Sequence, residues 1–417
     1  MKRKLFALAA FAALSIFVAA CGGSSSSTSS GASSPSSATN AAATSSSSST
    51  KGAINVLAVV DTSGPDKVVG VPQLEGLQAG AAYFNAHGGI LGHKVNVVVK
   101  NDNGDPTTAT TNLVQALSGN PNQYAMIWGG EEGTITSALI PVIARYKPFT
   151  IAVNDGTNLC QDSSHCPSEF TLAGAQTIPE ISQAQWFKSK GYKNVGIIYE
   201  EIAFTQTEAQ DLANDLKKLG IKSETVGLPT SATSATPEMS TLKSDGAQAV
   251  FAAAFGAPQG YIYNARPELS WQAPILWDAA GSSVDISKLA QTSQLKNSYE
   301  TPFYCMVPSH NVPGLAAAAS AETTPISGAI PCATWGQSFD AMVILNAAAK
   351  KAGSLSSSAL TSAMTSLKVT TADDAIFQPA YCWQTSNHEN TCYAPSAYTV
   401  TPVGAITGGR VQPIGAS

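Results

Sequence analysis

The chain has 417 residues, of which 44% are hydrophobic and 12% are charged, and its formal net charge at pH 7 is −5. This acidic balance argues against nucleic acid or an anionic membrane surface as a partner. Beyond the N-terminus no long apolar run occurs, so we expect a soluble body. Residues 51–417 are sufficient for two lobes of common domain size.

The N-terminus carries the pattern of a secretory signal. Met1 to Lys4 is a basic stretch, Leu5 to Val18 is apolar, and two alanines follow. A permanent transmembrane helix needs about twenty apolar residues, whereas serines begin here just after Cys21. We therefore predict that residues 1–20 are a signal peptide, which takes no part in the fold.

Residues 18–21 read Val-Ala-Ala-Cys, which resembles the lipobox of bacterial lipoproteins. The resemblance implies that Cys21 is acylated and becomes the first residue of the mature chain. Residues 22–50 are almost wholly Ser, Thr, Ala and Gly, so they should form a flexible tether with a reach of roughly 30 Å. The predicted location is the outer face of the cytoplasmic membrane, with contact to the membrane through the lipid only.

Six further cysteines remain, an even number that indicates a disulfide framework in an exported protein. Fifteen pairings are possible, and pairing by sequence neighbours is the most economical: Cys160 with Cys166, Cys305 with Cys332, and Cys382 with Cys392. A zinc site is the alternative, because His165 adjoins Cys166. No second Cys/His cluster of ligand spacing lies nearby, so we predict no metal and no cofactor.

Short apolar runs alternate with segments of helical period after residue 50. This order predicts two successive βαβαβ units, and hence an α/β fold with two doubly wound lobes. The expected strands are 54–60, 95–99, 124–128, 149–153, 195–199, 221–226, 249–254 and 275–277. Ligands of such sheets bind outside the carboxyl ends of the strands. The loops to inspect therefore follow Val60, Trp128, Val153, Tyr199, Ala254 and Trp277.

Residues 54–110 resemble the type I periplasmic binding proteins of the branched-chain amino acid class. The matching pieces keep their order and near-gapless spacing: Ser63-Gly64-Pro65, Gly70, Glu75-Gly76, Phe84-Asn85-Ala86-His87-Gly88-Gly89-Ile90-Leu91-Gly92-His93-Lys94 and Asp102-Asn103-Gly104-Asp105-Pro106. The resemblance extends to about residue 280, and a helix at 335–349 also fits. The stretch from Cys382 to Cys392 is not part of the family pattern.

The resemblance implies two lobes joined by a three-crossover hinge that closes on ligand. Lobe 1 is expected at 51–153 and 280–368, and lobe 2 at 154–279 and 369–417. It also implies that a monomer captures a small-molecule ligand for the permease and ATPase subunits of an ABC importer. Presentation of ligand to a membrane sensor is the runner-up. A lipid-anchored hydrolase is the third hypothesis, although no nucleophile elbow, histidine triad or phosphate-loop lysine is present.

The family holds a ligand carboxylate on the loop after the third strand, which here includes Gly130, Glu131 and Glu132. Two glutamates replace the usual small hydroxyl residues. They either turn outward and stabilise the helix N-terminus, or one of them faces the cleft. A cleft-facing carboxylate must be neutralised or satisfied by donors. We therefore predict a ligand rich in N–H or O–H groups, such as an amide, urea, amine or polyol.

The remaining candidate ligand contacts come from other strand ends. The family meets a ligand amine with an acid on the loop that begins at Phe255, but no acid stands there. Asp278 and Asp155 are possible substitutes, with helix capping or solvation as their alternative roles. Phe204 occupies the place of an aromatic residue that packs on ligand, and core packing is its alternative. The final candidates are Ser63 and Val69, the latter where many relatives carry an aromatic residue.

Overall fold

The computed structural model describes residues 51–130, 132–154, 158–174, 177–278, 280–321, 326–395 and 398–414. The predicted signal peptide, Cys21 and the tether lie outside these residues, as do Glu131 and Asp155. Within the described ranges, no helix combines the length and the apolar character needed to cross a bilayer.

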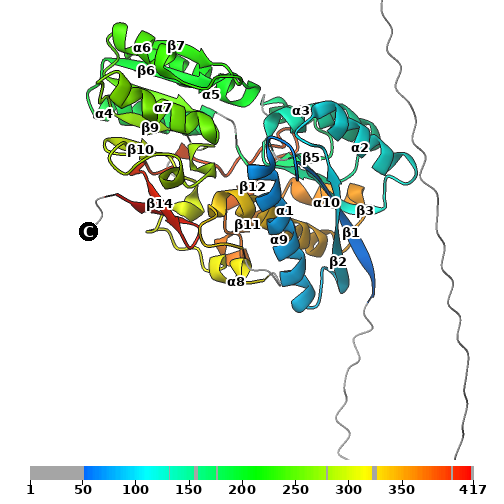
Figure 1. The fold of residues 1–417 in the computed structure, drawn as a ribbon. Coiled ribbons are helices and arrows are strands. Elements are labelled where there is room, and N and C mark those ends of the chain that lie inside the picture. Colours follow the sequence, from blue (N-terminus) through cyan, green and yellow to red (C-terminus); the bar gives the residue numbers. More distant parts are fainter. Residues whose placement is uncertain are drawn as a thin grey trace, which may run out of the picture. The chain divides into compact units, whose positions relative to one another are not determined.

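The first sheet is wholly parallel, with strand order β2-β1-β3-β4-β5. Helices α2 and α3 cover one face, while α1 and α9 cover the other (Figure 1). The alternation of β1 explains this, because Val56 and Ala58 enter one core and Leu57 and Val59 the other. The bounds are β1 (Lys51–Val60), α1 (Lys67–Ala86), β2 (His93–Asn101), α2 (Pro106–Ser118), β3 (Tyr124–Gly129), α3 (Gly133–Tyr146), β4 (Thr150–Ala152), β5 (Glu169–Thr171) and α9 (Cys332–Ala352).

The second sheet has the order β13-β10-β9-β8-β6-β7, and only β13 runs antiparallel to its neighbour. Helices α4 and α5 pack on one face and α6 and α7 on the other (Figure 1). The bounds are α4 (Thr177–Ser189), β6 (Asn194–Glu200), α5 (Ala203–Lys218), β7 (Lys222–Leu228), α6 (Thr236–Ser244), β8 (Ala249–Ala253), α7 (Ala257–Glu268), β9 (Ile275–Trp277), β10 (Ser298–Glu300) and β13 (Thr401–Pro402). The eight predicted strands are all present within a few residues of their expected positions.

The reversal between α1 and β2 shows how the glycine-rich motif works. Gly88 and Gly89 both have positive φ, at 92° and 79°, which a side chain would disfavour. The side chain of Asn85 then binds the backbone of Val95 in both directions, at 2.8 and 2.9 Å. The helix end is thereby fixed to the strand that follows it.

Most of the chain after β10 packs on the first sheet. Helix α9 is buried along nearly its whole length, and Gly76 of α1 lies against its backbone. The remaining elements are α8 (Leu315–Ala319), α10 (Ser357–Met364), the hairpin of β11 (Lys368–Thr370) and β12 (Ala380–Cys382), and the hairpin of β14 (Gly404–Thr407) and β15 (Arg410–Pro413).

The observed strands differ from the predicted lobe limits in three places. Strand β5 pairs with β4 of the first sheet, although residues 154–279 were expected in lobe 2. Strand β10 pairs with β9 of the second sheet, although it was expected in lobe 1. Tyr381 and Trp383 belong to the first core, although residues 369–417 were expected in lobe 2. Strands β5 and β10 are each three residues long and include a glutamate, so they lack the apolar run that marks buried strands.

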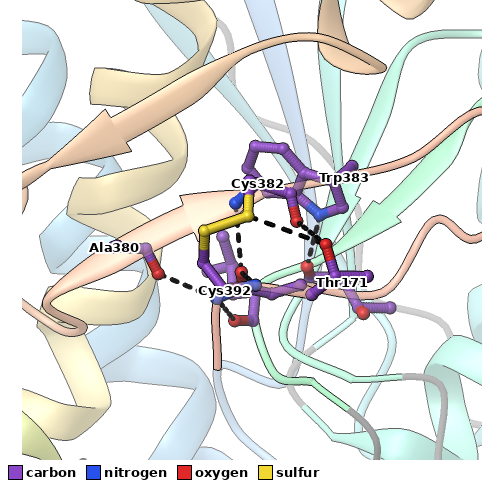
Figure 2. Close-up of a disulfide and its surroundings, with 8 residues drawn as sticks. Thr171, Ala380, Cys382, Trp383 and Cys392 are labelled. Atoms are coloured by element: carbon purple, nitrogen blue, oxygen red, sulfur yellow. Dashed lines mark hydrogen bonds between the residues drawn. A yellow bond between two sulfur atoms is a disulfide. The ribbon is translucent and has the colours of Figure 1, made fainter. Parts of the chain in front are cut away.

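The structure contains three disulfides, and each joins sequence neighbours. They link Cys160 to Cys166, Cys305 to Cys332, and Cys382 to Cys392, with Cα–Cα distances of 5.3, 6.2 and 5.3 Å. Figure 2 shows the third, which closes a loop beside Thr171 of β5. This is the neighbour pairing predicted from the sequence, and it leaves none of the six cysteines for a metal.

Candidate functional site

A pocket lies where segments of the two sheets meet, near the carboxyl ends of β4, β5 and β6. Its lining includes residues from α4 and α5 of the second lobe and from the connecting segments. Five aromatic side chains and one carboxylate stand out in a wall that is otherwise small or apolar. The lining residues are Val153, Asn154, Ala173, Gly174, Pro179, Phe204, Glu208, Phe303, Phe377, Tyr393 and Tyr398.

The aromatic side chains of the pocket contact one another in pairs. The rings of Phe303 and Phe377 have centroids 4.7 Å apart, and those of Tyr393 and Tyr398 are 5.0 Å apart and nearly perpendicular. The hydroxyl of Tyr393 accepts a hydrogen bond of 2.7 Å from the side-chain amide of Gln378. These contacts hold the aromatic walls in fixed orientations, as is usual in pockets for small molecules.

Glu208 of α5 is the carboxylate of the pocket wall. It is 2% exposed, and Glu180 and Asp278, both fully buried, are close enough to act on it. Burial raises the pKa of Glu208 well above its ordinary value, and the charge of Asp278 and a hydrogen bond between the two side chains raise it further. Burial also raises the pKa of Glu180. A hydrogen bond between two carboxyl groups requires a proton on one of them.

A second group of acids includes residues of both lobes. Burial, followed by the charges of Glu132, Asp61, Glu200 and Asp102, raises the pKa of Asp66 to about 6. Glu200 ends β6 of the second sheet, whereas the others belong to the first lobe. The facing surfaces of the lobes are therefore both acidic here.

Glu132 caps helix α3. Its two carboxylate oxygens accept hydrogen bonds from the backbone amides of Thr134 and Ile135, at 2.6 and 3.0 Å. Burial raises its pKa although these hydrogen bonds act in the opposite direction. Gly130 precedes it with φ at 98°, and a Cβ there would come within 2.9 Å of Ile135. The turn therefore requires glycine at position 130, and both carboxylate oxygens of Glu132 are used to cap the N-terminus of α3.

The other predicted contacts are dispersed around the pocket. Phe204 lines it, and its ring centroid lies 6.1 Å from that of Phe255. Asp278 accepts a hydrogen bond of 2.7 Å from the amide of Gly281 and adjoins Glu208. Ser63 is exposed and hydrogen-bonds to Asn103 at 2.9 Å. Val69 lies half-buried in α1, and neither it nor Ser63 is part of the pocket lining.

Sequence reasoning missed most of the pocket. Glu208 stands four residues after Phe204 on α5, so helical spacing alone places both on one face. This signal was present in the sequence. Tyr393 and Tyr398 follow the loop between Cys382 and Cys392, which the family pattern does not include. Their position depends on long-range packing that a local pattern does not encode.

The described part of the chain contains no group of three or more His, Cys, Asp or Glu side chains placed to hold a metal ion. The buried acids Glu180 and Asp278 adjoin Glu208, and a hydrogen bond joins Glu208 to Asp278. All electrostatic neighbours that shift the pKa of Glu208 are themselves acidic.

Two doubly wound lobes with a pocket between their connections define a solute-binding protein of the two-lobed α/β type. The model of the family described as periplasmic binding protein matches residues 53–398, and the chain belongs to this family. The match agrees with the resemblance seen in the sequence. Members of this family are binding proteins, so the chain is a binding protein and not an enzyme.

Solved structures with the same fold cover most of this chain at low identity. A type 1 periplasmic binding protein from Bordetella pertussis Tohama I is 19% identical, with a TM-score of 0.72, and the match covers 87% of this chain and 100% of that one. A fatty acid ABC transporter substrate-binding protein from Thermomonospora curvata is 16% identical, with a TM-score of 0.68 and coverage of 86% and 90%.

A solute-binding protein of an ABC transporter from R. palustris, solved with 4-hydroxybenzoate, is 17% identical, with a TM-score of 0.62 and coverage of 81% and 90%. No curated protein sequence matches the chain. At these identities the likeness establishes the fold and not the ligand.

Proposed function

We propose that this chain is a lipid-anchored, extracytoplasmic binding protein that captures a small polar solute and delivers it to the permease and ATPase subunits of an ABC importer. The observation that carries the proposal is the pocket itself. Val153 comes from the first lobe and Glu208 from the second. A ligand that contacts both favours the closed arrangement of a hinged protein, because only that arrangement makes both sets of contacts.

The acids around the pocket support a ligand rich in N–H or O–H donors. Glu208 lies in the wall, and Asp66 and Glu200 face each other from different lobes. A carboxylate ligand such as 4-hydroxybenzoate, which the R. palustris relative binds, would meet like charge here. An amine, amide, urea or polyol would instead donate hydrogen bonds to these carboxyl groups.

A thermal-shift screen of residues 22–417 tests this function. The panel should contain amino acids, amides, ureas, amines, polyols and aromatic acids. A ligand present at about 100 times its dissociation constant adds roughly 2.7 kcal/mol to the free energy of unfolding. We expect stabilisation by donor-rich solutes. Uptake of the same solute should be lost when the protein is deleted from its host.

Two results would contradict the proposal. If no solute class stabilises the protein, capture of a small polar ligand is wrong. If a ligand binds but its uptake is unchanged without the protein, delivery to an importer is wrong, and presentation to a membrane sensor becomes the better hypothesis.

A further inference from the structure

The side chain of Glu208 lines the aromatic pocket and has unused hydrogen-bonding capacity. It is 2% exposed, and its Oε2 has no hydrogen-bond partner among the described residues. Helix α5 places it one turn after Phe204, which lines the same pocket. A buried carboxylate oxygen without a donor costs free energy unless a ligand supplies one.

The neighbours that act electrostatically on Glu208 are themselves acids, and no lysine or arginine is among them in the described part of the chain. Glu180 lies beside it from α4, with neither carboxylate oxygen hydrogen-bonded within the described ranges. Asp278 approaches from the end of β9, and Asp211 from α5 itself. The nearby Lys218 pairs instead with Asp215, at 2.7 Å, on the exposed side of α5. A positively charged group in the pocket would therefore meet acids on this side and no competing cation among the described residues.

The opposite walls suit a positively charged group on an apolar body. Phe204, Phe303 and Tyr393 present rings to the same pocket, and aromatic faces attract cations while burying apolar surface. A carboxylate at one end of an aromatic enclosure is the arrangement that recognises organic cations. An anionic ligand of the same shape would be repelled by Glu208, and a neutral donor would form a weaker hydrogen bond than a charged one.

We propose that the pocket binds an organic cation, namely a protonated amine, amidine or guanidine on an apolar body, with its positive group against Glu208 and with Glu180 and Asp278 behind. This inference rests on the proposed solute-binding function and names the chemical class of the solute. It assigns the charge recognition to helices α4 and α5.

A purely structural cluster would behave differently from a binding site. Glu180, Glu208 and Asp278 could hold shared protons and stay neutral without any ligand. Burial raises the pKa of Glu208, and the acids facing it are Glu180 from α4, Asp211 from α5 and Asp278 from β9, with Tyr393 adjoining. A bound cation lowers that pKa again, so binding should release protons and strengthen as the pH rises. A structural cluster gives neither effect.

Calorimetry with matched probes tests the proposal on residues 22–417. Benzylamine, benzamidine and phenylguanidine are the cations, benzyl alcohol is the neutral analogue, and benzoate is the anion. We expect at least one cation to bind about tenfold or more tightly than benzyl alcohol, and benzoate not to bind. Titrations in phosphate and in Tris should reveal net proton release.

Two variants complete the test. Glu208→Gln keeps the shape of the side chain and should remove both the preference for cations and the proton release. Glu224→Gln makes the same change at an exposed position of β7 and should leave both unchanged. The melting temperature of each variant shows whether it is folded.

The proposal is overturned if benzyl alcohol or benzoate binds as tightly as the best cation. It is also overturned if folded Glu208→Gln keeps the preference, or if none of the cations binds at millimolar concentration. Binding and uptake of a neutral or anionic solute would contradict this inference but not the proposed function. Absence of any solute ligand would contradict the proposed function itself.

Discussion

The indole Nε1 of Trp383 donates a hydrogen bond of 2.9 Å to the backbone carbonyl oxygen of Thr171, across 212 positions of sequence (Figure 2). Trp383 follows the first cysteine of the loop closed by Cys382 and Cys392. From the same loop, Asn390 donates to the carbonyl oxygen of Leu172 at 3.1 Å. The disulfide loop is therefore hydrogen-bonded to the end of β5, where the chain leaves the first sheet.

Removing this disulfide should lower the stability of the protein. For a sequence separation of 10, chain entropy predicts a loss of roughly 2–3 kcal/mol in the free energy of unfolding when Cys382 and Cys392 are both replaced by serine. Urea denaturation measures it. The Trp383→Phe variant, which keeps the disulfide but loses the indole donor and part of the buried ring, should lose roughly 1–3 kcal/mol. An unchanged urea midpoint for the double variant would show that the loop is held by packing alone.

The close approach of helices α1 and α9 gives a second prediction. A Cβ at Gly76 would overlap the backbone carbonyl of Trp335 and the hydroxyl of Ser338. Gly76→Ala should therefore lower the free energy of unfolding by roughly 1–3 kcal/mol or more, because the helices must separate. Gly119 is the control, since it has a right-handed helical conformation and nothing within 4 Å of a built Cβ. Gly119→Ala should be neutral or stabilising. Equal melting temperatures for the two variants would contradict the packing argument.

The sequence predicted the parts of the fold that have local causes. The apolar runs predicted eight strands of the two large sheets. Asp105 followed by a proline predicted the start of α2, where Asp105 does accept the amide of Thr108 at 2.7 Å. Strands β5 and β10 were not predicted, because they form by pairing with neighbouring strands and have no apolar run of their own. Tyr393 reaches the pocket only through the loop tied to Thr171 and Leu172, which no local pattern reveals.

Glu300 should make stability depend on pH. It is buried, receives a hydrogen bond of 2.8 Å from Ser282, and burial raises its pKa to about 8. Between pH 4.5 and pH 8 the folded state therefore binds a proton that the unfolded state has lost. Stability consequently falls as the pH rises through this window, by up to about 1.4 kcal/mol per pH unit for this group.

Glu300→Gln keeps the acceptor for Ser282 and removes the titration. Its advantage in free energy of unfolding over the parent should grow from pH 5 to pH 8, as measured by urea denaturation at several pH values. The exposed Glu224→Gln variant should run parallel to the parent. A constant difference between Glu300→Gln and the parent across this range would show that Glu300 ionises freely in the folded state.

The predicted lipid anchor at Cys21 is tested in the host. The parent protein should fractionate with membranes because an acyl chain and not a protein helix holds it there. Cys21→Ser should be released into the soluble fraction or remain unprocessed, which immunoblotting of separated fractions distinguishes. A conservative change elsewhere in the tether, Ser24→Ala, should leave the distribution unchanged. Membrane attachment of processed Cys21→Ser would mean that something other than this cysteine anchors the chain.

A variant at Glu132 distinguishes a helix-capping role of this residue from direct contact with the ligand. Because both of its oxygens accept backbone amides of α3, Glu132→Ala should cost about 1 kcal/mol in the free energy of unfolding. Asp105→Ala, which removes the corresponding cap of α2, should cost a similar amount. The affinity for an organic cation should change less than about threefold in folded Glu132→Ala, since the charge it meets is that of Glu208 and the Glu132 carboxylate is already occupied. Calorimetry that finds a tenfold loss of affinity in Glu132→Ala, but none in Asp105→Ala, would move the ligand toward the first lobe and make Glu132 a direct contact.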